Sequence, residues 1–178
     1  MIKSTFFLLS ILLFSYAVSA QQKLTPVDAE SKVHFVIRNF GINTGGDLTG
    51  LKGQIVFDIK NPANSKFDIS VDVATIDTDN KKRDNHLRND DYFDVAKYPI
   101  IRINGKPDFV NNNSWILKAM LTIKDVSKPV EIPFTITPLP SGFLFEGAFA
   151  INRLHYRVGG ESATMSDDVN ITLKILAK

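Results

Sequence analysis

Apolar and polar side chains alternate, residue by residue, along eight segments of the chain. Between Phe67 and Val73, for example, apolar side chains alternate with Asp68, Ser70 and Asp72. Successive side chains of a β-strand point to opposite faces, so a period of two predicts strands with one apolar and one mostly polar face. The segments expected to form strands are 33–38, 51–60, 67–73, 101–104, 115–123, 130–137, 143–151 and 169–175.

Turn-forming residues separate the predicted strands. Because short connections favour antiparallel neighbours, the pattern indicates an antiparallel arrangement. The glycine-rich run 41–46 is not followed by a helix pattern, which a phosphate-binding loop requires, so we interpret it as a strand-to-strand turn. The turn signals are Gly45-Gly46, Asn61-Pro62, the asparagines 111–113, residues 124–127 and residues 140–142.

Two stretches interrupt the alternation. Residues 79–95 are highly charged and contain no β-branched residue before Val95, which favours a short helix with Asp79 or Asn80 as its N-cap. Residues 152–168 contain Gly159-Gly160 and predict a loop. The expected fold class is therefore all-β, with one short helical insertion at about residues 79–95.

Eight amphipathic antiparallel strands can form either a closed barrel or a two-sheet sandwich. An eight-stranded barrel is just wide enough to fill itself with side chains or to hold a small ligand. Phenylalanines are frequent on the apolar faces, which suits an apolar interior. They do not distinguish a packed core from a lined cavity, so the pattern alone leaves the architecture open.

The first twenty residues have the pattern of a secretory signal peptide. Lys3 precedes an apolar run over residues 6–18, and the small residues Ser19 and Ala20 end it, which predicts cleavage after Ala20. The apolar run is shorter than the ~20 residues that a membrane-spanning helix needs, so an uncleaved anchor is the less favoured alternative. We expect an exported chain in which residues 21–178 form a single domain.

Composition excludes several classes of function. Without Lys3 the 21 basic residues become 20, against 19 acidic ones, so there is no electrostatic case for binding nucleic acid. There is no cysteine, which excludes disulfides, thiol catalysis, cysteine-based zinc sites and covalent haem attachment. The histidines His34, His86 and His155 are far apart in sequence and lack metal-binding spacing, so no metal is expected.

The densest polar cluster, residues 83–94, allows two interpretations. It can form a cap over a barrel mouth, where arginine and histidine meet a polar head group. It can equally be a solvated helix with local ion pairs. No G-x-S-x-G motif is present and adjacent acid pairs such as Asp90-Asp91 would point apart in an extended segment, so the sequence predicts no enzyme.

Four segments together resemble the YceI-like, polyisoprenoid-binding family of exported bacterial proteins, from about Val27 to Ile175. Residues 83–87 (RDNHL), followed by 91–94 (DYFD) and Tyr98-Pro99, are similar to the family signature R-D-x-H-L…F-F-D…Y-P. The other three segments are 121–130 (LTIKDVSKPV), Ile151-Asn152-Arg153 with Tyr156, and 168–171 (DVNI). Asp125 and Arg157 stand where the family usually has glycine.

The resemblance implies an eight-stranded, lipocalin-like antiparallel β-barrel with an extended apolar cavity, which favours the barrel over the sandwich. It implies a periplasmic, non-enzymatic protein whose partner is an isoprenoid or another long-chain lipid, held non-covalently and without a further cofactor. Neither nucleic acid nor stable membrane insertion is expected, and a homodimer is left open. The alternatives are an enzyme acting on an isoprenoid- or quinone-type lipid, and a partner module of a membrane redox or stress system.

The apolar strand faces would then form the cavity wall, and basic residues would meet the head group, since burying it unpaired is costly. The alternative for the basic residues is that they form ion pairs that fix the cap to the barrel. The head-group or cap candidates are Arg83, His86 and Arg153. The predicted wall residues are Phe35, Ile37, Phe57, Ile69, Val71, Ile101, Ile103, Trp115, Leu117, Ile132, Phe134, Phe145, Phe149, Ile171 and Leu173.

Overall fold

The computed structural model describes residues 22–178, and the predicted signal peptide lies outside them. In this part of the chain, one α-helix, α1 (Lys81–Arg88), and short 3₁₀ turns at Asp28–Glu30, Pro62–Asn64, Val73–Thr75 and Arg153–Tyr156 accompany ten strands. The strands are β1 (Gln22–Leu24), β2 (Lys32–Asn39), β3 (Ile42–Leu48), β4 (Lys52–Phe57), β5 (Lys66–Asp72), β6 (Ile100–Asn111), β7 (Ser114–Ile123), β8 (Val126–Leu139), β9 (Gly142–Asn152) and β10 (Met165–Ala177).

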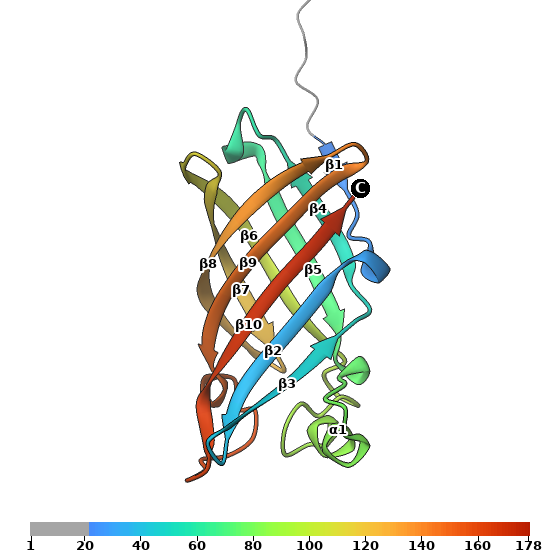
Figure 1. The fold of residues 1–178 in the computed structure, drawn as a ribbon, viewed down its shortest axis with the longest axis vertical. Helices are drawn as coiled ribbons and strands as arrows, with labels where there is room; N and C mark the ends of the chain where they lie inside the picture. Colours follow the sequence, from blue (N-terminus) through green and yellow to red (C-terminus); the bar gives the residue numbers. More distant parts are fainter. Residues whose placement is uncertain (1–21) are drawn as a thin grey trace, which may run out of the picture.

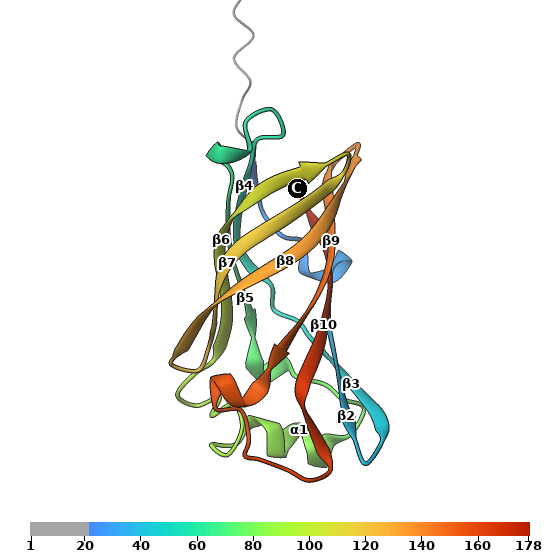
Figure 2. The same cartoon turned by 90° about the vertical axis from the view of Figure 1, so that its left-hand side faces the viewer.

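All ten strands belong to one antiparallel sheet in the order β1-β4-β5-β6-β7-β8-β9-β10-β2-β3, which curls into a tall barrel (Figures 1 and 2). The N-terminal segment joins the two sides of the curl at one end, because β1 pairs with β4 while Pro26 bridges Ala177 of β10. Near the other end, the backbones of Asp47 in β3 and Asp77 exchange hydrogen bonds of 2.8 and 3.1 Å. These contacts limit the exposed sheet edge.

The predicted all-β, antiparallel barrel with one short helix is confirmed, with two strands more than the eight expected. The interpretation of Gly45-Gly46 as a turn is wrong, because both residues lie within β3, paired with Val36 and Phe35. The turn is instead made by Phe40 and Gly41. A Cβ atom on Gly46 would lie 2.5 Å from the Phe35 ring, so glycine here makes room for a side chain.

The helix α1 lies within the predicted insertion. Asn80 is its N-cap, and the Asn80 side chain accepts a hydrogen bond of 3.1 Å from the backbone N–H of Arg83. The predicted loop 152–168 holds the 3₁₀ turn Arg153–Tyr156, and β10 begins at Met165 within it. None of the helices in residues 22–178 has the length and apolar character needed to cross a bilayer.

The two ends of the barrel differ. Aromatic rings fill the end where the C-terminus lies, with Phe57 edge-to-face against Trp115, Phe143 and Phe145 at centroid distances of 5.5, 5.6 and 5.7 Å. Such T-shaped pairs pack densely, and we call this the closed end. The helix α1, the β2–β3 hairpin and the loop before β10 gather at the opposite end (Figures 1 and 2), which we call the open end.

Candidate functional site

The barrel interior holds a cavity of about 350 Å³ that extends toward the open end. Every strand except β1 contributes to its lining, and most lining side chains are aliphatic or aromatic. This follows from the alternation in sequence, since one face of each strand of a barrel points inward. A cavity of this size and lining falls in the range of sites for small molecules.

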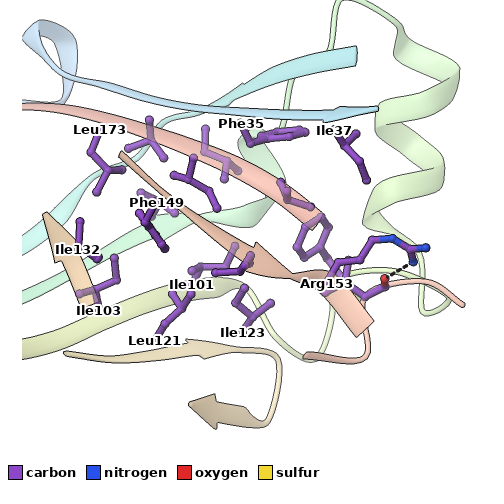
Figure 3. A pocket seen from close by; sticks show the side chains of 18 of the residues that line it. Phe35, Ile37, Ile101, Ile103, Leu121, Ile123, Ile132, Phe149, Arg153 and Leu173 are labelled. Carbon is purple, nitrogen blue, oxygen red and sulfur yellow. Dashed lines mark hydrogen bonds between the residues drawn. The ribbon is translucent and has the colours of Figure 1, made fainter. Parts of the chain in front are cut away.

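The middle of the barrel is incompletely filled by its own side chains. Ile69, Ile103, Phe149 and Leu173 line the cavity from four different strands, yet each is only partly buried. Figure 3 shows side chains of this wall, including Ile103, Phe149 and Leu173, around a common space. Protein interiors are normally packed as densely as organic crystals. The barrel therefore encloses an apolar space in place of a continuous core.

The structure places thirteen of the fifteen predicted wall residues on the cavity lining. The other two, Phe57 and Trp115, face the barrel interior but belong to the aromatic cluster of the closed end, beyond the cavity. The residues on the lining are Phe35, Ile37, Ile69, Val71, Ile101, Ile103, Leu117, Ile132, Phe134, Phe145, Phe149, Ile171 and Leu173.

Sequence reasoning did not single out several other lining residues. Many of them, including Val33, Ile55 and Phe67, belong to the same alternating faces, so the period of two contained the signal. Val158 and Met165 also line the cavity but come from the predicted loop, where no periodicity marks them. Only the folded arrangement brings these two to the open end.

Thr78 is the polar junction that holds α1 against the barrel. Its backbone N–H and its hydroxyl donate to the buried carboxylate of Asp84, at 2.9 and 2.5 Å. The Thr78 hydroxyl oxygen in turn accepts from Arg83 Nε at 2.8 Å, and Arg83 Nη2 donates to the Thr78 carbonyl. Arg83 thus lines the cavity mouth while two of its three guanidinium nitrogens are anchored.

The other head-group candidate on α1, His86, also lines the mouth but is exposed. Its imidazole stands edge-to-face on the Tyr92 ring, with 4.9 Å between centroids. The neighbouring Leu87 and Phe93 pack against the barrel core. The segment from Asn80 to Phe93 therefore forms a cap with an apolar underside and a basic, partly solvated rim.

Arg153 also lines the cavity, but its guanidinium is committed to the chain. This side chain is 4% exposed. Its Nε donates to the Ser166 carbonyl at 2.9 Å, its Nη1 to the carbonyls of Val158 and Gly160 at 3.0 and 2.8 Å, and its Nη2 to Asp167 at 3.0 Å. Figure 3 includes one of these bonds. The contacts give Arg153 a structural role, but they hold the loop before β10 and the start of that strand and do not reach the cap.

Backbone and surface contacts join the loop before β10 to the rest of the open end. The Gly159 N–H donates to the Asp91 carbonyl at 3.0 Å, and Arg157 forms an ion pair with Asp125 of the β7–β8 turn. Burial acts to raise the pKa of Asp125, but hydrogen bonds from its own backbone N–H and from Arg157 lower it overall. Burial raises the pKa of the Tyr156 phenol nearby.

The sequence of this barrel matches a known protein family. The model of the YceI-like domain matches residues 24–177. The chain belongs to the YceI-like family. Its relatives include UPF0312 proteins of Photorhabdus laumondii, 30% identical over 117 residues (65% of this chain and 61% of that protein), and of Yersinia pestis, 30% identical over 122 residues (68% and 64%). The match thus spans less than two thirds of the length of these curated relatives.

Solved structures share the fold of this YceI-like chain. BcnA of Burkholderia cenocepacia superposes with a TM-score of 0.82 at 25% identity, covering 86% of this chain and 99% of BcnA. The YCEI protein of Campylobacter jejuni gives 0.68 at 26% identity, covering 75% and 84%. A polyisoprenoid binding domain from Saccharophagus degradans, implicated in plant cell wall breakdown, gives 0.68 at 13% identity, covering 89% and 99%.

Proposed function

We propose that this YceI-like protein binds a long apolar chain, an isoprenoid or a similar amphiphile, inside the barrel and carries or sequesters it in the periplasm. The observation that carries the proposal is the incompletely filled interior, where Ile69, Ile103, Phe149 and Leu173 face a shared space. Apolar cavities stay dry and take up apolar ligands, since water finds no hydrogen-bond partners there. The likeness in fold to a polyisoprenoid binding domain agrees with this choice of ligand class.

The gain from burial is large enough for useful affinity. Each methylene group moved from water into the cavity contributes about 0.8 kcal/mol. Ten buried carbons would therefore contribute about 8 kcal/mol, which exceeds the low end of the estimated cost, about 4 kcal/mol, of losing translational and rotational freedom on binding. The closed end is plugged by aromatic rings, so the apolar chain enters tail-first and its head group remains at the open end.

We assign the head group to Arg83 and His86. Arg83 reaches the cavity lining with its Nε and Nη2 anchored on Thr78, and in this proposal its Nη1 donates to the head group. His86 is exposed at the same rim. Arg153 has a different part in the proposal, because its guanidinium is already bonded to four groups, two in the loop before β10 and two at the start of β10. It positions the rim and leaves the head group to α1.

Mass spectrometry of the native protein tests the proposal. We expect lipid to copurify with the chain and to be released on denaturation, and the same spectra report whether the mature chain begins at Gln21. Ile103→Trp, which fills the cavity from β6, should reduce the bound fraction at least about tenfold, because it removes room for several methylene groups. Lys106→Trp is the matched control, since Lys106 is exposed on the same strand.

A protein that retains no lipid and binds no polyprenyl or fatty-acyl probe would overturn the proposal, as would equal loss in the Ile103→Trp and Lys106→Trp variants. The proposal is one of binding without turnover. It rests on the structural use of the polar side chains at the cavity mouth: Arg83, for example, bonds Thr78 and so holds the cap in place. Lipid recovered chemically unchanged after long incubation with the protein is the expected result; a converted lipid would favour an enzyme.

A further inference from the structure

At the tip of the β2–β3 hairpin, Phe40 adopts a backbone conformation that its residue type disfavours. Asn39 pairs with Ile42, so Phe40 and Gly41 form a two-residue turn with φ angles of 50° and 76°. Positive φ at both central residues defines the turn type that favours Asn, Asp or Gly. Phe40 adopts the left-handed conformation at a position where an aromatic residue is unfavourable. The turn therefore keeps a phenylalanine that its backbone geometry disfavours.

The two apolar side chains of the tip are also strongly exposed, Phe40 by 74% and Ile42 by 70%. Among the large hydrophobic side chains exposed in residues 22–178, these have the highest exposed fractions. Single exposed apolar residues are common, but here two project from one turn. Conflicts between a residue and its local structure are expected at functional sites.

The hairpin also forms part of the cavity mouth. Ile37, Asn39 and Thr44 on its two strands line the cavity, while Phe40 and Ile42 extend beyond them. In both views the tip and α1 lie at the same end of the barrel (Figures 1 and 2). Whatever covers the tip therefore lies next to the opening of the apolar cavity.

We propose that Phe40 and Ile42 insert into the surface of a phospholipid bilayer and hold the cavity mouth against the membrane. The inference goes beyond the proposed function, because it concerns an outer surface and not the cavity. Two backbone groups at the tip are already hydrogen-bonded within the protein, which lowers the cost of moving them into an apolar environment. The Phe40 N–H donates to the Thr164 carbonyl at 2.9 Å, and the Gly41 carbonyl accepts from Arg38 Nε at 3.1 Å.

The size of the tip favours a bilayer over a second protein chain. A stable protein interface buries roughly 1,000 Å² or more, which two side chains at the tip of one hairpin do not supply. Reversible association with a bilayer needs only a small apolar insertion. Residues 38–44 contain one basic residue, Arg38, and no acidic one, so nothing in the hairpin opposes contact with lipid phosphates.

Flotation with vesicles of pure phosphatidylcholine tests the proposal. The mature protein should float with the vesicles, and Phe40→Ser combined with Ile42→Ser should lower its partition coefficient about tenfold or more, because two apolar insertions are lost. High salt should change little, since exposed charge contacts are screened but apolar burial is not. Val110→Ser is the matched control, because Val110 is 47% exposed at the β6–β7 turn of the closed end.

A Phe40→Trp variant gives an independent optical signal. Its emission should shift to the blue when vesicles are added, while Trp115, buried at the closed end, adds a constant background. A wild-type protein that does not float, equal loss in Val110→Ser, or release by salt would overturn the proposal. So would a dimer that the double variant dissociates without vesicles, since the occupant would then be a second copy. Binding of a fluorescent polyprenyl probe without vesicles tests the cavity separately, and the double variant should retain it.

Discussion

The carboxylate of Asp84 accepts two hydrogen bonds from Thr78, one from the backbone N–H at 2.9 Å and one from the hydroxyl at 2.5 Å. Asp84 lies in the first turns of α1, and Thr78 precedes the helix. Both groups are buried, and Arg83 donates to the same threonine hydroxyl. An eight-residue helix is too short to be stable alone, so this junction and the packing of Leu87 hold it in place.

Asp84→Ala should therefore lower the free energy of unfolding by about 1–3 kcal/mol, because it leaves the N–H and hydroxyl of Thr78 buried without their acceptor. Hydrogen exchange of the α1 amides should accelerate more than that of β7. Urea denaturation and exchange mass spectrometry measure the two effects. Lys82→Ala, at an exposed position on the same helix, should change the free energy of unfolding by no more than about 0.5 kcal/mol and should leave the exchange of the α1 amides as it is in the wild type. A variant with protected α1 amides would show that the junction does not hold the cap.

Gly46→Ala should reduce the cavity volume that is open to a ligand, and should have only a small effect on the free energy of unfolding. The added Cβ atom would lie 2.5 Å from the Phe35 ring and 2.7 Å from Thr78, so the ring must move. Phe35 lines the cavity, so its ring has room to move inward, into the volume that a ligand would occupy. Affinity for a polyprenyl probe should fall several-fold, measured by fluorescence titration. Gly160→Ala, with nothing within 4 Å of the new atom, should bind as the wild type does.

Gly46 also marks the limit of what the sequence could predict. The period of two located the inward faces, because the alternation is local and each strand obeys it independently. A glycine pair has the same composition whether it makes a turn or clears space for a ring across the sheet, so the partner Phe35 was needed to distinguish them. Phe57 and Trp115 show the same limit, because the level at which the aromatic plug ends and the cavity begins depends on every strand together.

The basic residues near the mouth could not be divided by sequence for a similar reason. Arg83, His86 and Arg153 all reach the cavity lining, as expected of residues from the cap and the loop. Their roles differ because they donate hydrogen bonds to different acceptors, several of which are main-chain carbonyl groups. Arg153 is bonded to three main-chain carbonyls, which leave no trace in side-chain identity. Only the folded loop reveals that all three guanidinium nitrogens of Arg153 are anchored, against two of the three in Arg83.

Arg153→Lys should destabilise the open end despite keeping the charge. The guanidinium donates to Ser166, Val158, Gly160 and Asp167 in four directions, and a lysine ammonium has three donors at a single point. At least one of the four acceptors would lose its partner, and the shorter, differently shaped lysine side chain would not reproduce the fork of the guanidinium, so the free energy of unfolding should fall by about 1–3 kcal/mol. Limited proteolysis should cut residues 159–164 faster. Arg157→Lys, an exposed neighbour, provides the control; equal cleavage in both variants would argue against an anchoring role for Arg153.

The ion pair between Asp68 and Arg102, on the outer surface of β5 and β6, should make the stability of the fold depend on pH. Arg102 Nε and Nη2 each donate to one carboxylate oxygen of Asp68 at 2.7 Å, and this bonding lowers the pKa of Asp68 below its ordinary value of 3.8. A carboxylate with a lowered pKa in the folded state stabilises the fold above its unfolded pKa and loses that contribution as the pH falls through the folded value. The melting temperature of Asp68→Asn should therefore lie below that of the wild type at neutral pH, by no more than about 2–4 °C because the pair is partly exposed. The difference should begin to shrink as the pH falls below 3.8 and should vanish only below the lowered pKa of Asp68 in the folded state. In an Arg102→Gln background, Asp68→Asn should cause no such loss at neutral pH, and a loss that persists there would assign the effect to something other than the pair.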